Sequence, residues 1–203
     1  MDRLNATAAN LNAHGFSAQV FDTGADAKQA ALAIIGDRSV GFGGSITVNE
    51  LGIYETVTKK GNKAFWHWKA DEATPAPAML AGAQAADVYI CSANAIIETG
   101  SLLNIDGTGN RVANLFYGPK TVIVIAGENK LAPNYDEALA RIKREACPSN
   151  GKRLNMKTPC TATGVCTDCD SPQRMCRVTV LLERPTFAVP EVHVLLVRES
   201  LGY

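Results

Sequence analysis

The chain has 203 residues, and its 20 Lys and Arg residues balance its 20 Asp and Glu residues, so the formal net charge is zero. This balance disfavours a general nucleic-acid-binding protein, which needs a basic excess to displace counterions. No stretch approaches the roughly 18 consecutive apolar residues of a membrane span, and the first residues contain no apolar segment typical of a signal peptide. We therefore expect no membrane association, a cytoplasmic location and a single domain over residues 1–203.

Apolar residues repeat at helical spacing in several segments, beginning with Leu4, Ala8 and Leu11. Thr23 precedes Asp26 by three residues, and Thr47 precedes Glu50 by three, so each pair resembles a capping box at a helix start. The predicted helices cover residues 4–14, 23–36, 47–60 with a kink at Gly52, 73–83, and 135–146 with Asn134 as its cap.

Short apolar runs between these segments have the length of buried strands, and TVIVIA at residues 121–126 is the clearest of them. The predicted strands cover residues 16–21, 39–42, 64–68, 87–91, 121–126, 177–182 and 192–197. Strands that alternate with helices indicate an α/β fold with a largely parallel sheet flanked by helices. Ligands bind such sheets beyond the carboxyl ends of the strands.

The segment VGFGGSITVNE, at residues 40–50, leads from a strand through glycines into a helix. The glycines allow close backbone approach to a ligand, and free amides at a helix start favour an anion. Ser45 and Thr47 add hydroxyl groups to Gly43 and Gly44. The spacing matches neither the dinucleotide-binding fingerprint nor the P-loop, so we expect no nicotinamide cofactor. A tight strand-to-helix turn explains the same residues without a ligand.

The segment SANAIIETGSLLNIDGTGNRVA, at residues 92–113, concentrates polar groups between small turn formers. We predict Glu98 as general base or nucleophile, with Asp106 second, because a carboxylate in a dry cleft can titrate near the operating pH. The predicted ligand-binding residues here are Asn94, Thr99, Gly100, Asn104 and Arg111. Arg111 can hold a carboxylate or phosphate in bidentate fashion. The alternative is a β-hairpin with its turn at residues 98–100, followed by a second turn at Asp106.

Four stretches, VGFGGSITVNELG, FWHW, SANAIIETGSLLNIDGTGNRVA and GPKTVIVIAGENK, together resemble the LUD-domain family, the lactate-utilisation proteins. The resemblance covers nearly the whole chain. It implies a fold like that of sugar-phosphate isomerases and CoA transferases, in which Asp and Asn side chains and glycine amides surround a small phosphorylated or carboxylated ligand. It also implies a link to the oxidation of L-lactate to pyruvate.

Four of the six cysteines, Cys160, Cys166, Cys169 and Cys176, have the spacing C-x5-C-x2-C-x6-C within residues 148–177, which read as an insertion. Clustered cysteines in a reducing compartment favour a metal centre. The spacing is near that of plant-type iron–sulfur sites but does not match it, and zinc sites use two close pairs. The family resemblance favours an iron–sulfur cluster over zinc. A loop of reduced thiols, and disulfides formed during purification, are the alternatives.

Three further residues have ordinary structural explanations. Lys130, after the strand TVIVIA, is predicted to be a solvated side chain in a loop, and His67, between Trp66 and Trp68, is predicted to be a structural residue rather than part of the site. Cys147, at a helix end, and Cys91, in a strand, are predicted to be structural thiols.

Two hypotheses of different class follow. In the first, the chain binds a small anionic metabolite of the hydroxy-acid, sugar-phosphate or acyl-CoA type, takes part in lactate metabolism, carries a metal centre and passes electrons to protein partners. In the second, it is a non-catalytic subunit or metabolite sensor, whose cysteine segment fixes the fold or docks a partner. A homo-oligomer is compatible with both.

Overall fold

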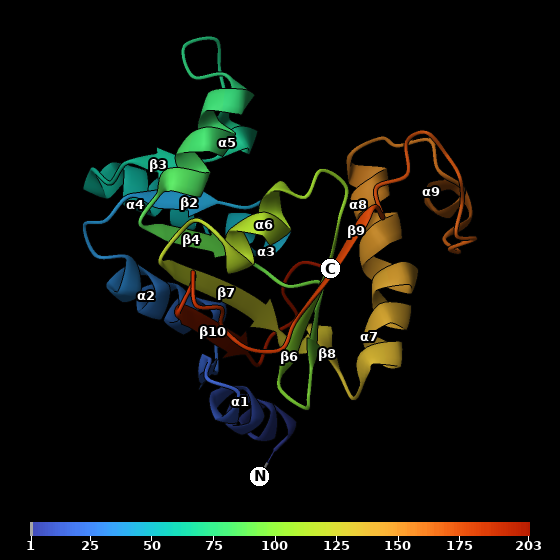
Figure 1. Ribbon diagram of the computed structural model, residues 1–203, viewed down its shortest axis with the longest axis horizontal. Helices are drawn as coiled ribbons and strands as arrows, with labels where there is room; N and C mark the ends of the chain where they lie inside the picture. Colours follow the sequence, from blue (N-terminus) through green and yellow to red (C-terminus); the bar gives the residue numbers. More distant parts are fainter. Residues whose placement is uncertain (1) are drawn as a thin grey trace.

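The computed structural model describes residues 2–203 and contains two sheets (Figure 1). The larger sheet has six strands, in the spatial order β1 (Ser17–Phe21), β10 (Glu191–Val197), β7 (Thr121–Gly127), β4 (Val88–Cys91), β2 (Val40–Phe42) and β3 (Ala64–Phe65). All neighbouring strands in this sheet are parallel. Their carboxyl ends therefore lie along one edge, where loops from separate parts of the chain meet.

Helices cover both faces of the larger sheet, because its strands are apolar on both sides. In the central strand β7, Val122 and Val124 face one core, while Ile123 and Ile125 face the other. The first core includes residues of α1 (Arg3–Ala13), α5 (Ala76–Ala85) and α6 (Asn110–Phe116). The second includes residues of α2 (Gly24–Ile35), α3 (Ile46–Glu50) and α4 (Ile53–Lys60). Continuous burial of a strand on both faces is typical of parallel sheets.

The smaller sheet has four strands, in the order β8 (Leu131–Ala132), β5 (Ala95–Ile97), β6 (Ser101–Asp106) and β9 (Val178–Leu182). A long helical segment packs against it, formed by α7 (Tyr135–Arg141), a π-helical turn (Ile142–Ala146) and α8 (Cys147–Arg153). Pro148 lies at the start of α8. A proline has no amide hydrogen to donate within a helix, and the wider π-helical turn directly before it accommodates this interruption.

The cysteine segment, residues 154–177, leaves the end of α8 and includes the short helix α9 (Pro159–Thr163). Figure 1 shows α9 on the outer side of α8, away from the larger sheet. We predicted that the insertion begins at residue 148, but the helix continues to Arg153. The chain then returns to the body through β9, which pairs antiparallel with β6.

The structure confirms the predicted α/β class and the largely parallel sheet flanked by helices. The predicted strand at residues 64–68 is wrong beyond Phe65, because residues 67–69 form a 3₁₀ turn that stacks the rings of Trp66 and Trp68 with centroids 5.0 Å apart. Ser45, and not Thr47, caps α3, since its hydroxyl accepts from the amide of Val48. Across residues 2–203, none of the helices combines the length and apolarity that crossing a membrane requires.

Candidate functional site

A cavity of about 260 Å³ lies where the carboxyl ends of the parallel strands meet the smaller sheet. The turn after β2 contributes Gly44, Ser45 and Thr47 to its wall, and the turn after β4 contributes Ser92 and Asn94. The chain after β7 contributes Lys130, and the C-terminal Tyr203 closes part of the wall. This is the edge of a parallel sheet at which ligands bind in α/β proteins.

Lys130 is the most unusual group in this wall, because only 3% of the residue is exposed. Its Nζ donates to Oγ1 of Thr47 and to Oγ of Ser92, each at 2.9 Å. None of the ion pairs formed within residues 2–203 includes Lys130. The prediction of a solvated lysine was therefore wrong, and the structure holds a buried amine without a carboxylate partner.

Burial lowers the pKa of Lys130 from 10.5 to about 7, because a charged ammonium is poorly solvated there. The guanidinium groups of Arg141 and Arg111 lower the pKa further, whereas Glu50 and Cys91 act in the opposite direction. The amine therefore changes its charge near neutral pH, which is the range in which a side chain works as a proton donor or acceptor.

The free energy of unfolding should rise with pH between about 7 and 10.5 because of Lys130. Over this interval the unfolded chain holds the lysine proton that the folded chain has released, so the slope is positive and at most about 1.4 kcal/mol per pH unit. Urea unfolding of the wild type and of Lys130→Met at several pH values measures this slope, since other titrating groups cancel in the difference. A constant difference from pH 7 to pH 10 would show an ordinary lysine pKa.

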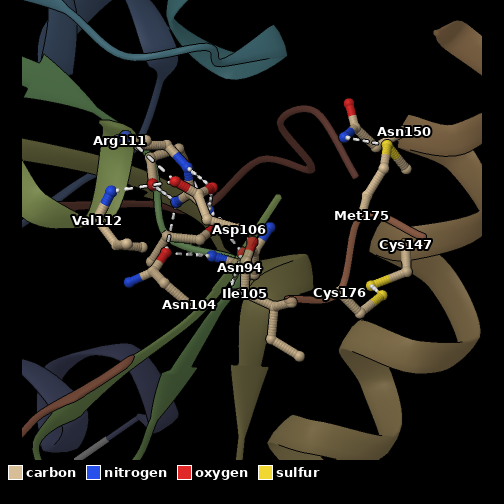
Figure 2. A network of polar contacts seen from close by, with 12 residues as sticks. Asn94, Asn104, Ile105, Asp106, Arg111, Val112, Cys147, Asn150, Met175 and Cys176 are labelled. Carbon is tan, nitrogen blue, oxygen red and sulfur yellow. Dashed lines mark hydrogen bonds and ion pairs between the residues drawn. The ribbon is translucent and has the colours of Figure 1, made fainter. Parts of the chain in front are cut away.

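Arg111 lies at the centre of a network of hydrogen bonds in the cavity wall (Figure 2). Its Nη1 donates to Oδ1 of Asn104 at 2.6 Å and to the carbonyl of Ser92, and its Nη2 donates to Oδ1 of Asn94 at 2.8 Å. Nε and Nη2 both contact Oδ1 of Asp106, at 3.1 and 3.0 Å. All guanidinium nitrogens thus have protein partners, so Arg111 is placed to hold the loops together rather than to clamp a ligand.

Asp106 is fully engaged in the same network. Its second oxygen accepts from the amides of Arg111 and Val112, which are the first free donors of α6. Among the side chains that line the cavity, Asp106 is the one carboxylate. No side-chain carboxylate in the wall is therefore free to act as a general base.

His67, Trp68 and Arg153 form the wall of the cavity beside α8. The Arg153 guanidinium stacks over the Trp68 ring at 4.5 Å and also donates to Asn150 and to the hydroxyl of Tyr203. Nδ1 of His67 is buried without a hydrogen-bond partner among residues 2–203. Burial, and the nearby charge of Arg153, lower the pKa of His67. The prediction that His67 lies outside the site was wrong, because its ring lines the cavity.

Cys147 and Cys176 lie at the wall beside α8, with their sulfur atoms 3.3 Å apart (Figure 2). The two thiols share a hydrogen bond, and this bond together with the charges of Arg174 and Lys143 lowers the pKa of Cys176. The same bond and burial raise the pKa of Cys147. We predicted Cys147 as a structural thiol at a helix end, and the structure pairs it with Cys176 of the cysteine segment.

The predicted four-cysteine metal centre does not fit this arrangement. Within residues 2–203, no three His, Cys, Asp or Glu side chains lie close enough together to hold a metal ion. The thiol of Cys176 contacts the thiol of Cys147, whereas the thiol of Cys160 contacts the hydroxyl of Thr158. A metal at Cys160, Cys166, Cys169 and Cys176 requires the segment to rearrange.

The structure brings most of the predicted ligand-binding residues to one place. Gly44, Ser45, Thr47, Asn94 and Arg111 line the cavity, as does Asp106, which was predicted as a catalytic residue. Gly43 and Asn104 lie directly behind them: a side chain at Gly43 would collide with Arg111 and Tyr89, and Asn104 is fully buried against Arg111. Residues of both glycine-rich loops therefore border one cavity.

Glu98, Thr99 and Gly100 are not part of this site, which corrects the prediction that they share it. They form the turn between β5 and β6, as the hairpin alternative predicts, and this turn packs on α1. The carboxylate of Glu98 accepts from Nε and Nη2 of Arg3, at 2.8 and 2.6 Å. The Gly100 carbonyl lies 2.7 Å from Nδ1 of His14. The polar character of these residues is explained by their attachment to α1.

Comparisons with known proteins agree with this architecture. The family model described as LUD domain matches residues 4–197. Among solved structures, the chain is similar to a DUF162 family protein from Deinococcus radiodurans, with 15% sequence identity and a TM-score of 0.56 over 97% of this chain and 99% of the other. At this identity the likeness shows a shared fold. A search of curated proteins found no match.

Proposed function

The chain belongs to the LUD-domain family, and from that premise we propose that it binds a small anionic metabolite in the cavity at Lys130. The observation that carries the proposal is the buried amine, which has two neutral hydroxyl partners and no carboxylate. A buried cation costs free energy unless it is paired. A ligand carboxylate or phosphate beside this amine would favour its protonated form, and the stacked Arg153 provides a permanent cation in the same wall.

The size of the cavity favours the smaller of the anions considered. A volume of about 260 Å³ lies just below the roughly 300–1,000 Å³ of most small-molecule sites. A hydroxy acid or a sugar phosphate suits this space better than an acyl-CoA, whose nucleotide would have to remain outside. The Ser45 hydroxyl at the wall, which accepts from the amide of Val48, can donate its hydrogen to a ligand oxygen.

Ligand-induced thermal stabilisation across hydroxy acids, sugar phosphates and acyl-CoAs tests the proposal. A ligand at 100 times its Kd stabilises the folded state by about 2.7 kcal/mol. We expect one class of small anion to raise the Tm of the wild type, and Lys130→Met to lose most of this rise. Glu98→Gln is the matched control, because Glu98 lies outside the cavity. Equal ligand-induced shifts in wild type and Lys130→Met would contradict the proposed site.

The family supports a role in L-lactate utilisation, which we propose together with a cytoplasmic location, where thiols stay reduced. If the chain turns its ligand over, proton transfers fall to Lys130 and His67, since both oxygens of Asp106 are occupied. That occupancy also favours the second candidate function, a sensor or non-catalytic subunit. Turnover by the purified protein alone supports an enzyme, whereas binding without turnover supports the sensor.

The metal centre at the cysteine segment is a separate proposal, which rests on the spacing of the four cysteines and has no support from the present geometry. Metal content and visible absorbance of protein purified without oxygen test it. Iron with sulfide would support a redox centre that passes electrons to a protein partner, and stoichiometric zinc would support a structural clamp. Protein without either metal would leave a segment of thiols and would refute the metal centre.

A further inference from the structure

The hydrogen bonds around Lys130 match a neutral amine. The Thr47 hydroxyl donates to the carbonyl of Leu201 at 3.2 Å, and the Ser92 hydroxyl donates to the carbonyl of Ala93 at 3.3 Å. Each hydroxyl has therefore used its own hydrogen and can only accept from Nζ. A neutral lysine has two N–H donors, and Thr47 and Ser92 take both. The fourth tetrahedral position on Nζ carries the lone pair, on a side chain that lines the cavity.

A nitrogen lone pair that is held in place and shielded from bulk water is the requirement for a lysine nucleophile. The absence of an ion pair to Lys130 among residues 2–203 is consistent with the same state, since a carboxylate partner would keep the amine protonated. The cavity also offers hydrogen-bond donors for a ligand anion away from Nζ. Nη1 of Arg153 makes no hydrogen bond to the described residues, while Nε and Nη2 are used.

We propose that Lys130 forms an imine with the carbonyl carbon of a small 2-oxo acid, whose carboxylate Arg153 receives. This inference rests on the proposed function and names the substrate class. Nζ attacks the carbonyl carbon, the carbonyl oxygen gains a proton, and the resulting carbinolamine loses water to give the C=N bond. One amine and one carbonyl thus yield one imine and one water, without a change in oxidation state.

Reductive trapping tests the proposal on the full-length protein. Pyruvate and glyoxylate are the probes, and sodium cyanoborohydride reduces any imine to a stable secondary amine. Intact mass and peptide mapping then locate the adduct. We expect Lys130 to be labelled at least tenfold more than any other lysine, with half-maximal rate near pH 7 rather than near pH 10. Lys130→Met should show only the background labelling of exposed lysines. Circular dichroism confirms that this variant is folded.

A control ketone and an Arg153 variant distinguish a failure of this inference from a failure of the proposed function on which it rests. Acetone, a ketone without a carboxylate, should label Lys130 at least tenfold more slowly than pyruvate, and Arg153→Ala should remove this preference. Labelling spread evenly over exposed lysines, while small anions still stabilise the wild type more than Lys130→Met, would overturn the imine and leave the anion site intact. Equal labelling of Lys130 by acetone and pyruvate would overturn the 2-oxo acid as the substrate class.

Discussion

Replacing Arg111 with methionine should lower the free energy of unfolding by about 3–5 kcal/mol, the usual cost of removing one partner of a buried ion pair. Its side chain is 9% exposed, that of Asp106 is 13% exposed, and the two are 3.0 Å apart. The substitution also leaves the acceptors Asn94 and Asn104 without their donor. Since a domain of this kind is stable by only about 5–15 kcal/mol, urea unfolding should detect the loss readily.

A second substitution shows whether the loss comes from the unpaired charge. The double variant Asp106→Asn/Arg111→Met removes both charges, so it should be more stable than Arg111→Met alone. Arg111→Lys should be intermediate, because an ammonium cannot reproduce the planar set of donors. A loss below about 1 kcal/mol in Arg111→Met would show that the network contributes little. In that case Arg111 could serve a ligand instead of the fold.

The sequence predicts the larger sheet well, because a strand that is buried on both faces consists almost entirely of apolar residues. Segments such as TVIVIA at residues 121–126 are apolar on both faces, and β7 lies at the centre of that sheet. Thr23 was expected at a helix start, and its hydroxyl does cap α2. The predicted strand at residues 64–68 failed after Phe65, because stacking of Trp66 on Trp68 overrides the alternation of a strand.

The sequence is less informative about which polar residues meet in space. Lys130 follows the strand TVIVIA and Glu98 joins two short strands, and neither position shows locally that one side chain is buried in a cavity while the other lies outside it. Lys130 becomes buried because the C-terminal residues 199–203 and the turn at Ser92 fold over it, and these lie far away in the sequence. The contact between the Glu98 carboxylate and Arg3 on α1 holds Glu98 away from the cavity, and Arg3 is equally distant from Glu98 in the sequence. The signal for Lys130 was its place directly after a buried parallel strand, where ligands of α/β folds bind.

Gly127 shows how the end of β7 and the C-terminal segment together cover the site. Its φ of −73° suits any residue, so only the space around it requires glycine. A β-carbon there would overlap the carbonyl oxygen of Glu199 and come 2.6 Å from the amide nitrogen of Leu201. Both are backbone atoms and cannot move without shifting the C-terminal segment. Leu201 in turn accepts from Thr47, one of the two partners of Lys130.

Gly127→Ala should therefore lower the free energy of unfolding by about 1–3 kcal/mol, the range for overpacking a buried position, and should also weaken the site. Displacement of Leu201 exposes Lys130, so its pKa should move back toward 10.5 and the rise of stability with pH should become smaller. Urea unfolding at pH 7 and pH 10 measures both effects in one series, and thermal shifts with the stabilising anion measure the weakening of binding.

Gly61→Ala is the control for the added methyl group, because nothing lies within 4 Å of its β-carbon and Gly61 is remote from the cavity. Its φ of +99° makes alanine cost about 1 kcal/mol through the backbone alone. The pH dependence and the anion-induced shift should stay those of the wild type. If Gly127→Ala behaves like Gly61→Ala in all three measurements, the C-terminal segment does not cover Lys130, and the lowered pKa must come from the charges of Arg141 and Arg111 instead.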